Sequence, residues 1–144
     1  MSRSVLIDTG AFHALQNARE PERHQAARDA SEQLRAENAL LVTTDYILDE
    51  TYTLLRSTLG HRSAIQFEDE IQSAAIQVVQ VDEALQREAW AIFERYSDKD
   101  FSFTDCTSFA VMEKGKIRAA FTLDHHFRQY GFETLPALPS RRRR

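Results

Sequence analysis

The chain has 144 residues, of which 42% are hydrophobic and 28% are charged, and its formal net charge is −4. This length and composition favour a single globular domain with its own hydrophobic core and exclude a largely disordered chain. The sequence has no apolar run of the roughly 18 residues that a membrane span requires and no signal peptide, and its single cysteine, Cys106, excludes an internal disulfide, so we expect a cytoplasmic protein.

The charge is distributed unevenly, because the last four residues, 141–144, are all arginine. Without them, 14 of the 18 basic residues remain against 22 acidic ones, which leaves a net charge of −8. A domain this acidic does not attract nucleic acid through its net field, so bound cations or local basic patches would have to supply positive charge. We divide the chain into a domain over residues 1–136 and a basic tail over 137–144, which we expect to be disordered.

The first half of the chain alternates strand and helix patterns. Aliphatic and β-branched runs predict strands, and amphipathic stretches behind a capping residue predict helices. In chain order, the patterns predict a strand over 5–7, helices over 9–17 and 21–37, a strand over 39–42, a helix from about 45 to 59 that Gly60 ends, and a helix over 61–73.

The second half continues this alternation. The patterns predict a strand over 76–81, a helix capped by Asp82, a polar loop over 97–100, a helix from Phe103, a strand over 119–123, a short helix, and a strand over 133–135. Strands that alternate with helices lie parallel, with right-handed crossovers on both faces of the sheet. The predicted fold class is therefore α/β, a three-layer sandwich around a central, mostly parallel sheet of four or five strands.

Ligands of open α/β sheets bind outside the carboxyl ends of the strands, which directs attention to the residues that follow each strand. Asp8 directly follows the first strand, and Asp124 directly follows the strand predicted over 119–123. Because aspartate is a favoured helix N-cap, capping of the next helix is the alternative explanation for each of them.

Glu50 lies on the helix predicted over 45–59, with Ile47 three residues before it and Leu54 four residues after it. These spacings place the three residues on one face, which we interpret as the apolar face of the helix. An unpaired carboxylate that is desolvated there is strongly unfavourable, so Glu50 needs a cation, a proton or a cleft. A salt bridge to Arg56 or Arg62 is the alternative.

Asp105 heads another inward-facing stripe, because Phe109 and Met112 follow it at positions i+4 and i+7. The neighbouring hydroxyls of Thr104, Thr107 and Ser108 are candidates for contacts that orient the acid. Helix capping is again the alternative.

The sequence thus offers four carboxylates that we expect to converge at one end of the sheet: Asp8, Glu50, Asp105 and Asp124. Clustered carboxylates repel one another, and Mg²⁺ or Mn²⁺ relieves that repulsion because both ions prefer oxygen ligands. We see no zinc pattern, since the adjacent His125 and His126 cannot both point at one site from a helix.

The segments around these acids resemble the motifs of the PIN-domain nucleases, a family that includes VapC-type toxins. The resembling segments follow one another in the family's order: Val5-Leu6-Ile7-Asp8-Thr9-Gly10-Ala11-Phe12, Asp49-Glu50-Thr51-Tyr52-Thr53-Leu54-Leu55, Phe103-Thr104-Asp105-Cys106-Thr107-Ser108-Phe109-Ala110 and Phe121-Thr122-Leu123-Asp124-His125-His126-Phe127. The resemblance extends from about residue 4 to residue 136 and depends on the ordered set, since each motif alone is short.

The resemblance implies a Mg²⁺- or Mn²⁺-dependent endoribonuclease that hydrolyses RNA and leaves 5′-phosphate and 3′-hydroxyl ends. It implies that Asp8, Asp105 and Asp124 hold the ion, with Glu50 as an outer ligand or as the group that orients the attacking water. Thr104 and Thr9 are further candidates for supporting contacts. For toxin members of the family, it also implies a homodimer and inhibition by a cognate antitoxin protein.

Other functions stay open at this point. One is a PIN nuclease that processes RNA without an antitoxin, and another is a catalytically silent PIN-like binding module, against which the presence of all four acids argues. A receiver-type domain is disfavoured because Asp8 has no acidic neighbour and no lysine follows the late strand. A haloacid-dehalogenase-type phosphatase is disfavoured because Gly10 stands where that class needs a second aspartate.

Overall fold

A parallel sheet forms the centre of the fold. The computed structural model describes residues 2–137, and the strands in this part are β1 (Ser4–Ile7), β2 (Leu40–Thr44), β3 (Ile76–Val79), β4 (Ala119–Phe121) and β5 (Glu133–Leu135). Their order across the sheet is β3-β2-β1-β4-β5, and every neighbouring pair is parallel. The predicted α/β class with a parallel sheet is confirmed, with five strands.

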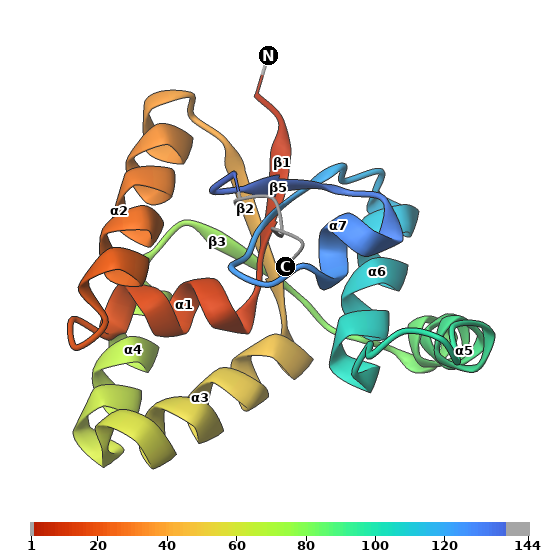
Figure 1. Ribbon diagram of the computed structural model, residues 1–144, viewed down its shortest axis with the longest axis horizontal. Helices are drawn as coiled ribbons and strands as arrows, with labels where there is room; N and C mark the ends of the chain where they lie inside the picture. The colour runs from red at the N-terminus through yellow and green to blue at the C-terminus, as the bar shows by residue number, and fades with distance from the viewer. Residues whose placement is uncertain (1, 138–144) are drawn as a thin grey trace, which may run out of the picture.

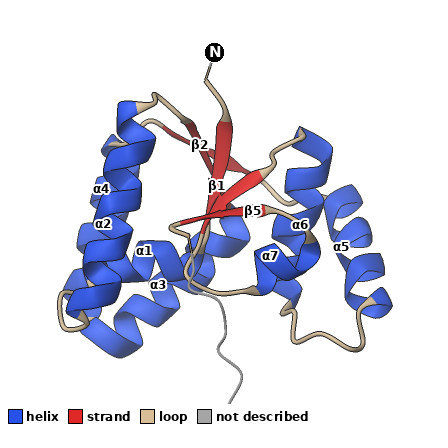
Figure 2. Ribbon diagram, turned by 45° about the horizontal axis from the view of Figure 1, so that its top comes forward, coloured by secondary structure: helices blue, strands red, loops and turns tan. Residues whose placement is uncertain are grey.

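Helices cover both faces of this sheet, as Figures 1 and 2 show. Within residues 2–137 they are α1 (Thr9–Gln16), α2 (Pro21–Ala36), α3 (Asp45–Leu59), α4 (His61–Ser73), α5 (Glu83–Arg95), α6 (Phe103–Gly115) and α7 (His126–Tyr130). Helices α1 to α4 pack against one another on one side, and α5, α6 and α7 form the other layer. The basic tail that we expected to be disordered lies, from residue 138 onward, outside the described residues.

Capping residues set where the helices begin and end. The hydroxyl of Thr44 accepts a hydrogen bond from the backbone N–H of Ile47 at 3.0 Å, and the Asp82 carboxylate accepts one from Leu85 at 2.9 Å. Gly60, with φ of 104°, ends α3 in a backbone conformation that few other residues adopt. These local signals explain why the predicted helix boundaries agree with the structure to within about one residue.

Three strands end at a residue other than the predicted one. The strand predicted over 76–81 ends at Val79. The strand predicted over 39–42 continues to Thr44, because Thr43 and Thr44 are buried and pair with β3. The strand predicted over 119–123 ends at Phe121, although the N–H of Thr122 still donates to the carbonyl of Leu135 at 2.9 Å. As a result, Asp124 follows a short bend and does not directly follow the strand.

The core lies where the helices meet the central strands. Val5, Leu6 and Ala120 on β1 and β4 have no exposed surface, and Phe109 of α6 and Phe127 of α7 are equally buried beside them. None of the described helices has the length and hydrophobicity to cross a membrane.

The chain reverses its direction across the sheet between β1 and β4. From β1 it moves through β2 to β3, and it then returns to place β4 on the opposite side of β1 (Figure 1). In sheets of this type, such a switch point opens a crevice at the carboxyl ends of the two strands, where ligands bind. The residues that follow β1 and β4 therefore occupy the position at which a site is expected.

Candidate metal centre

Asp8 follows β1 directly and is almost completely buried, with 4% of its surface exposed. The hydroxyl of Thr122, behind β4, donates to Asp8 Oδ2 at 3.1 Å, and the backbone N–H of Thr9 also bonds to the carboxylate. Burial raises the pKa of the Asp8 carboxyl well above its usual range, and the negative charges of Asp124 and Asp105 raise it further. Beyond the adjacent Thr9, the Asp8 side chain makes no capping hydrogen bond to the first turn of α1, so capping alone does not explain this residue.

Asp105 lies at the third position of α6 and forms a capping box with Ser102. The Ser102 hydroxyl accepts from the Asp105 N–H at 3.0 Å, and Asp105 Oδ2 accepts from the Ser102 N–H at 3.0 Å. The capping role that we considered is thus present, and it fixes the orientation of the carboxylate. Burial raises the pKa of Asp105, the charge of Asp124 adds to this, and the bonds from Ser102 and His126 offset part of the effect.

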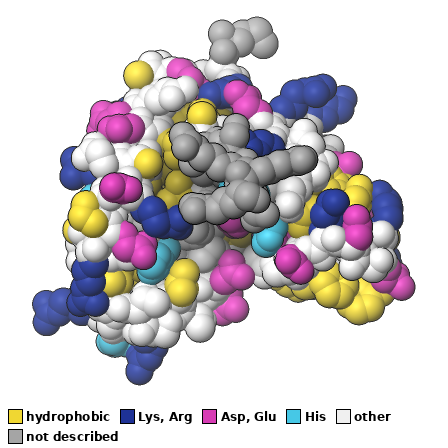
Figure 3. All heavy atoms as spheres, in the orientation of Figure 1, with side chains coloured by type: hydrophobic (Ala, Val, Ile, Leu, Met, Phe, Trp, Pro, Cys, Tyr) yellow, Lys and Arg dark blue, Asp and Glu magenta, His cyan; other side chains and the backbone are white. Residues whose placement is uncertain are grey.

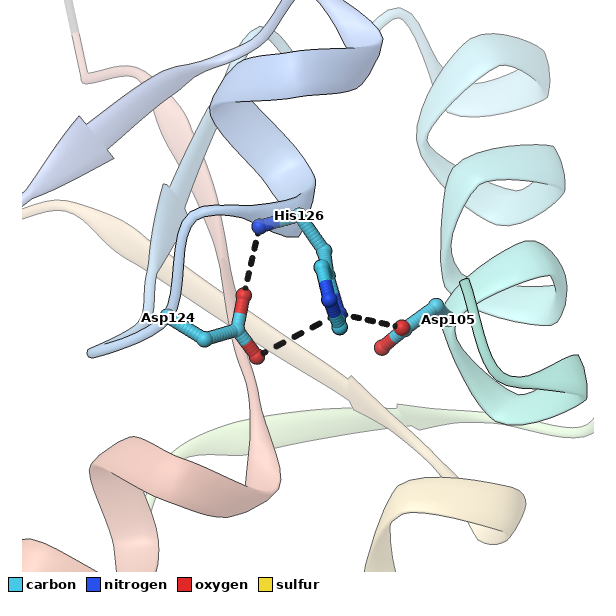
Figure 4. A group of neighbouring side chains, drawn as sticks. All are labelled: Asp105, Asp124 and His126. Carbon is cyan, nitrogen blue, oxygen red and sulfur yellow. Dashed lines mark hydrogen bonds and ion pairs between the residues drawn. The ribbon is translucent and has the colours of Figure 1, made fainter. Parts of the chain in front are cut away.

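Asp124 and His126 enter the same place from the segment between β4 and α7. The His126 backbone N–H donates to Asp124 Oδ1 at 2.9 Å, and the ring Nδ1 lies 2.8 Å from Asp105 Oδ2. Figure 4 shows the imidazole between the two carboxylates, with Nδ1 4.0 Å from Asp124 Oδ2. One ligand atom from each of Asp105, Asp124 and His126 lies within 4.8 Å of the other two.

Three acids that are far apart in the sequence therefore meet at the switch point. Thr122 connects two of them, because its hydroxyl also accepts from the Asp124 N–H at 3.3 Å while it donates to Asp8. Gathering three carboxylates where two of them are buried is unfavourable unless a proton or a cation offsets their charge. Oxygen donors of this kind suit a hard divalent ion, so the residues fit the divalent metal that the family resemblance implies.

Glu50 does not lie where we argued that it would. It is exposed on α3, and it is outside the group of Asp105, Asp124 and His126. The buried residues of α3 include Ile47, Thr51 and Leu55. The argument from an apolar face is therefore wrong, because the polar Thr51 belongs to the inward face and Glu50 does not.

Glu50 nevertheless borders a hollow between α3 and the start of α6, which none of Asp8, Asp105 and Asp124 lines. This hollow has a volume of about 650 Å³, and its walls include Glu50, Asp49 and Tyr46 from α3 and Thr104 from α6, the residue before Asp105. That Glu50 acts on the ion or on its water stays a prediction. It requires that the Glu50 side chain reach the ion or the water from this hollow.

The threonines that we expected to support the site have different contacts. The Thr9 hydroxyl donates to the Ile47 carbonyl at 3.4 Å. Thr9 therefore bonds to the Asp8 carboxylate through its backbone N–H and not through its hydroxyl. Thr104 borders the hollow, and its carbonyl accepts from the hydroxyls of Thr107 at 2.6 Å and Ser108 at 3.2 Å. The hydroxyls of Thr107 and Ser108 are thus used within α6.

Sequence reasoning missed three residues of the site, namely His126, Thr122 and Ser102. The adjacent histidines were dismissed together because both cannot point at one site, yet one of them does. Ser102 was recognisable, since serine followed three residues later by an acid is a capping-box pattern. Nothing in the sequence singles out the hydroxyl of Thr122.

Comparison with known proteins is consistent with this geometry. The sequence model described as "PIN domain" matches residues 5–133. The chain is 34% identical over 128 residues to the 23S rRNA-specific endonuclease VapC20 of Mycobacterium tuberculosis, which covers 89% of this chain and 95% of that protein. It is 29% identical over 117 residues to a VapC ribonuclease of Archaeoglobus fulgidus, which covers 80% of this chain and 74% of that protein.

A solved structure agrees as well. The crystal structure of Mycobacterium tuberculosis VapC20, described as a sarcin-ricin loop cleaving toxin, superposes with a TM-score of 0.80 at 35% sequence identity, covering 90% of this chain and 96% of that one.

Proposed function

Because the chain belongs to the PIN domain family, we propose that it is the toxin of a VapC-type toxin–antitoxin pair, an endoribonuclease that depends on a divalent metal ion. The observation that carries this proposal is the convergence of Asp8, Asp105 and Asp124 at the switch point of the sheet. The two relatives compared above are named as RNA-cleaving enzymes, and they match most of the chain.

The ion would be held by Asp105 and Asp124, with Asp8 behind them. When bound, Mg²⁺ or Mn²⁺ lowers the pKa of a coordinated water and offsets charge on the phosphate oxygens. The chain's own groups prepare the site for this role. The Ser102 N–H orients the Asp105 carboxylate, and the Thr122 hydroxyl orients Asp8. We propose that Glu50 acts from the neighbouring hollow on the attacking water.

The substrate is RNA, and the name of the Mycobacterium tuberculosis relative makes 23S rRNA the first RNA to test. The charge of the chain supports the need for an ion. Figure 3 shows Lys and Arg side chains in separate groups on the viewed face, with acidic side chains between them, and not as one basic surface. We expect the positive charge at the scissile phosphate to come mainly from the metal ion.

We also propose that the protein forms a homodimer and that a cognate antitoxin protein inhibits it. Support for the dimer comes from an exposed aromatic patch formed by Trp90, Phe93 and Phe103 on α5 and α6. Trp90 is 53% exposed and Phe93 41% exposed, and their ring centroids lie 5.6 Å apart. Figure 3 shows hydrophobic side chains gathered where α5 lies. We propose that the same patch of a second copy of the chain covers these aromatic side chains.

The test of the nuclease activity is incubation of the purified protein with total RNA and with 23S rRNA, with Mg²⁺ or Mn²⁺ and with EDTA. We expect cleavage that needs the ion and that leaves 5′-phosphate and 3′-hydroxyl ends. Asp105→Asn should abolish cleavage, whereas Asp69→Asn, an exposed aspartate on α4, should not. Equal cleavage by Asp105→Asn would contradict the assignment of the site.

The toxin role has a separate test. Expression of the protein should arrest growth, and expression of Asp105→Asn should not. Co-expression of the gene beside this one should relieve the arrest if it encodes the antitoxin. Cleavage of RNA without growth arrest would instead favour the second candidate, a PIN nuclease of RNA processing.

A further inference from the structure

We propose that His126 supplies an imidazole nitrogen to the divalent ion, so that the site favours Mn²⁺ over Mg²⁺ more strongly than carboxylates alone would. This inference rests on the proposed metal-dependent function. It adds a ligand from the segment between β4 and α7 to the acids, and it predicts which ion the enzyme uses.

The spacing of the side-chain atoms fits ligands of one ion. Around an octahedral ion with ligands at about 2.1 Å, adjacent ligand atoms are about 3.0 Å apart and opposite ones about 4.2 Å apart. His126 Nδ1 lies 2.8 Å from Asp105 Oδ2 and 4.0 Å from Asp124 Oδ2. The nitrogen is therefore close enough to both carboxylates for all three side chains to hold one ion.

The ring is held in this position by its surroundings. The His126 backbone N–H is bonded to Asp124 Oδ1 at 2.9 Å, so the residue and the acid form one local unit. The edge of the Phe101 ring contacts the imidazole at a centroid distance of 5.7 Å. The next residue, Phe127, is completely buried and anchors the start of α7. These contacts direct Nδ1 of the ring toward the two carboxylates.

The alternative is that His126 only orients Asp105 by a hydrogen bond. That role needs a proton on Nδ1, whereas a metal ligand needs the lone pair of Nδ1 and carries its proton on Nε2. The two roles therefore have different consequences for the ion. Both ions prefer oxygen ligands, but Mn²⁺ is a transition-metal ion and accepts an imidazole nitrogen more readily than Mg²⁺ does. A hydrogen bond to Asp105 would change the affinities for both ions alike.

His125 provides a matched control in the adjacent position. Its Nδ1 accepts a hydrogen bond from Arg128 Nη2 at 2.9 Å, and it is not part of the group with Asp105 and Asp124. Both histidines are partly buried, so the same substitution at each changes the surface to a comparable degree.

The direct experiment is pulsed electron paramagnetic resonance of the Mn²⁺-loaded protein, prepared with natural histidine and with ¹⁵N-histidine. We expect a nitrogen coupling that changes with the isotope, that is absent in His126→Ala and that persists in His125→Ala. This readout does not depend on activity, and the labelled wild-type protein alone gives it if a variant fails to fold. Bound Mn²⁺ without histidine nitrogen coupling would overturn the inference and leave the acidic metal site standing.

The second experiment measures equilibrium binding of Mn²⁺ and Mg²⁺ to the wild-type protein, His126→Ala, His126→Asn and His125→Ala. We expect the two His126 variants to lose about tenfold or more in Mn²⁺ affinity and much less in Mg²⁺ affinity. Equal losses for both ions would show that His126 only orients Asp105 and would overturn the inference. A wild-type protein that binds neither ion would overturn the proposed metal site itself.

Discussion

Replacement of Asp8 by asparagine should stabilise the metal-free protein. The carboxylate is buried, and the charges of Asp105 and Asp124 repel it, so its ionised form costs free energy in the folded state. Each unit by which burial and repulsion raise a pKa corresponds to about 1.4 kcal/mol at neutral pH. Asparagine has one side-chain oxygen to accept the hydrogen bonds from Thr122 and Thr9, where aspartate has two. The poorer hydrogen bonds lower the free energy of unfolding by about 1 kcal/mol. We expect a net gain of about 1–2 kcal/mol in the free energy of unfolding.

The pH dependence of this gain follows from the direction of the shift. Folding raises the pKa of Asp8 above the ordinary value of 3.8. The stability that depends on this group is fully present below about pH 3.8, and it is lost as the pH rises through the folded-state pKa. The advantage of Asp8→Asn should therefore be largest at neutral pH and should shrink as the pH falls below the folded-state pKa. Near pH 3.8 the variant should be the less stable protein by about 1 kcal/mol, because only the cost of the poorer hydrogen bonds remains.

The assay is thermal unfolding followed by circular dichroism in EDTA, at pH 7.5 and at lower pH values. For a chain of this size, 1 kcal/mol corresponds to about 2–4 °C in Tm. Asp69→Asn serves as the exposed control and should leave Tm within about 1 °C of wild type. With Mn²⁺ the order should reverse, since the ion stabilises the wild type by binding its folded state. If Asp8→Asn melts below the wild type in EDTA at neutral pH, the repulsion argument is refuted.

Three further predictions concern other parts of the molecule. Glu50→Gln should lower the cleavage rate constant by about tenfold at saturating ion and leave the Mn²⁺ affinity nearly unchanged, because we propose that Glu50 acts on the attacking water and does not bind the ion. A tenfold loss of Mn²⁺ affinity would instead make Glu50 a direct ligand. Ser102→Ala should lower the free energy of unfolding in denaturant by about 1 kcal/mol and also weaken Mn²⁺ binding, because the capping box orients Asp105. A loss of stability with unchanged Mn²⁺ binding would show that Ser102 only caps α6. We propose that the wild-type protein sediments as a dimer in analytical ultracentrifugation, and Trp90→Ala combined with Phe93→Ala should then sediment as a monomer without a lower Tm in dilute solution. An unchanged mass would exclude the aromatic patch as the interface.

The strand-end rule explains why much of the site could be predicted from the sequence. Asp8 follows an unbroken apolar strand, and in a parallel sheet that position opens toward the ligand crevice. Asp105 was recognisable because apolar residues follow it at positions i+4 and i+7, although in the structure residues 105–112 are all buried and α6 has no single inward face. In both cases a short local pattern determines the position of the residue, and the topology of the sheet then brings the acids together.

The two failures have a common physical origin. The inward face of α3 includes the polar Thr51, which donates to the Ile47 carbonyl within the helix, so hydrophobicity alone assigned the wrong face to Glu50. The choice between His125 and His126 depends on the backbone of a short bend after β4, where one ring turns to Asp105 and the other to Arg128. Neither side-chain direction is encoded in a periodic pattern.

The most direct test of the central claim is an anomalous difference map from crystals of the protein grown with Mn²⁺. The account predicts a manganese peak at the switch point of the sheet, at bonding distance of about 2.1–2.2 Å from carboxylate oxygens of Asp105 and Asp124, with Asp8 beside it. A map with no peak there, or with these carboxylates turned away from one another, would contradict it.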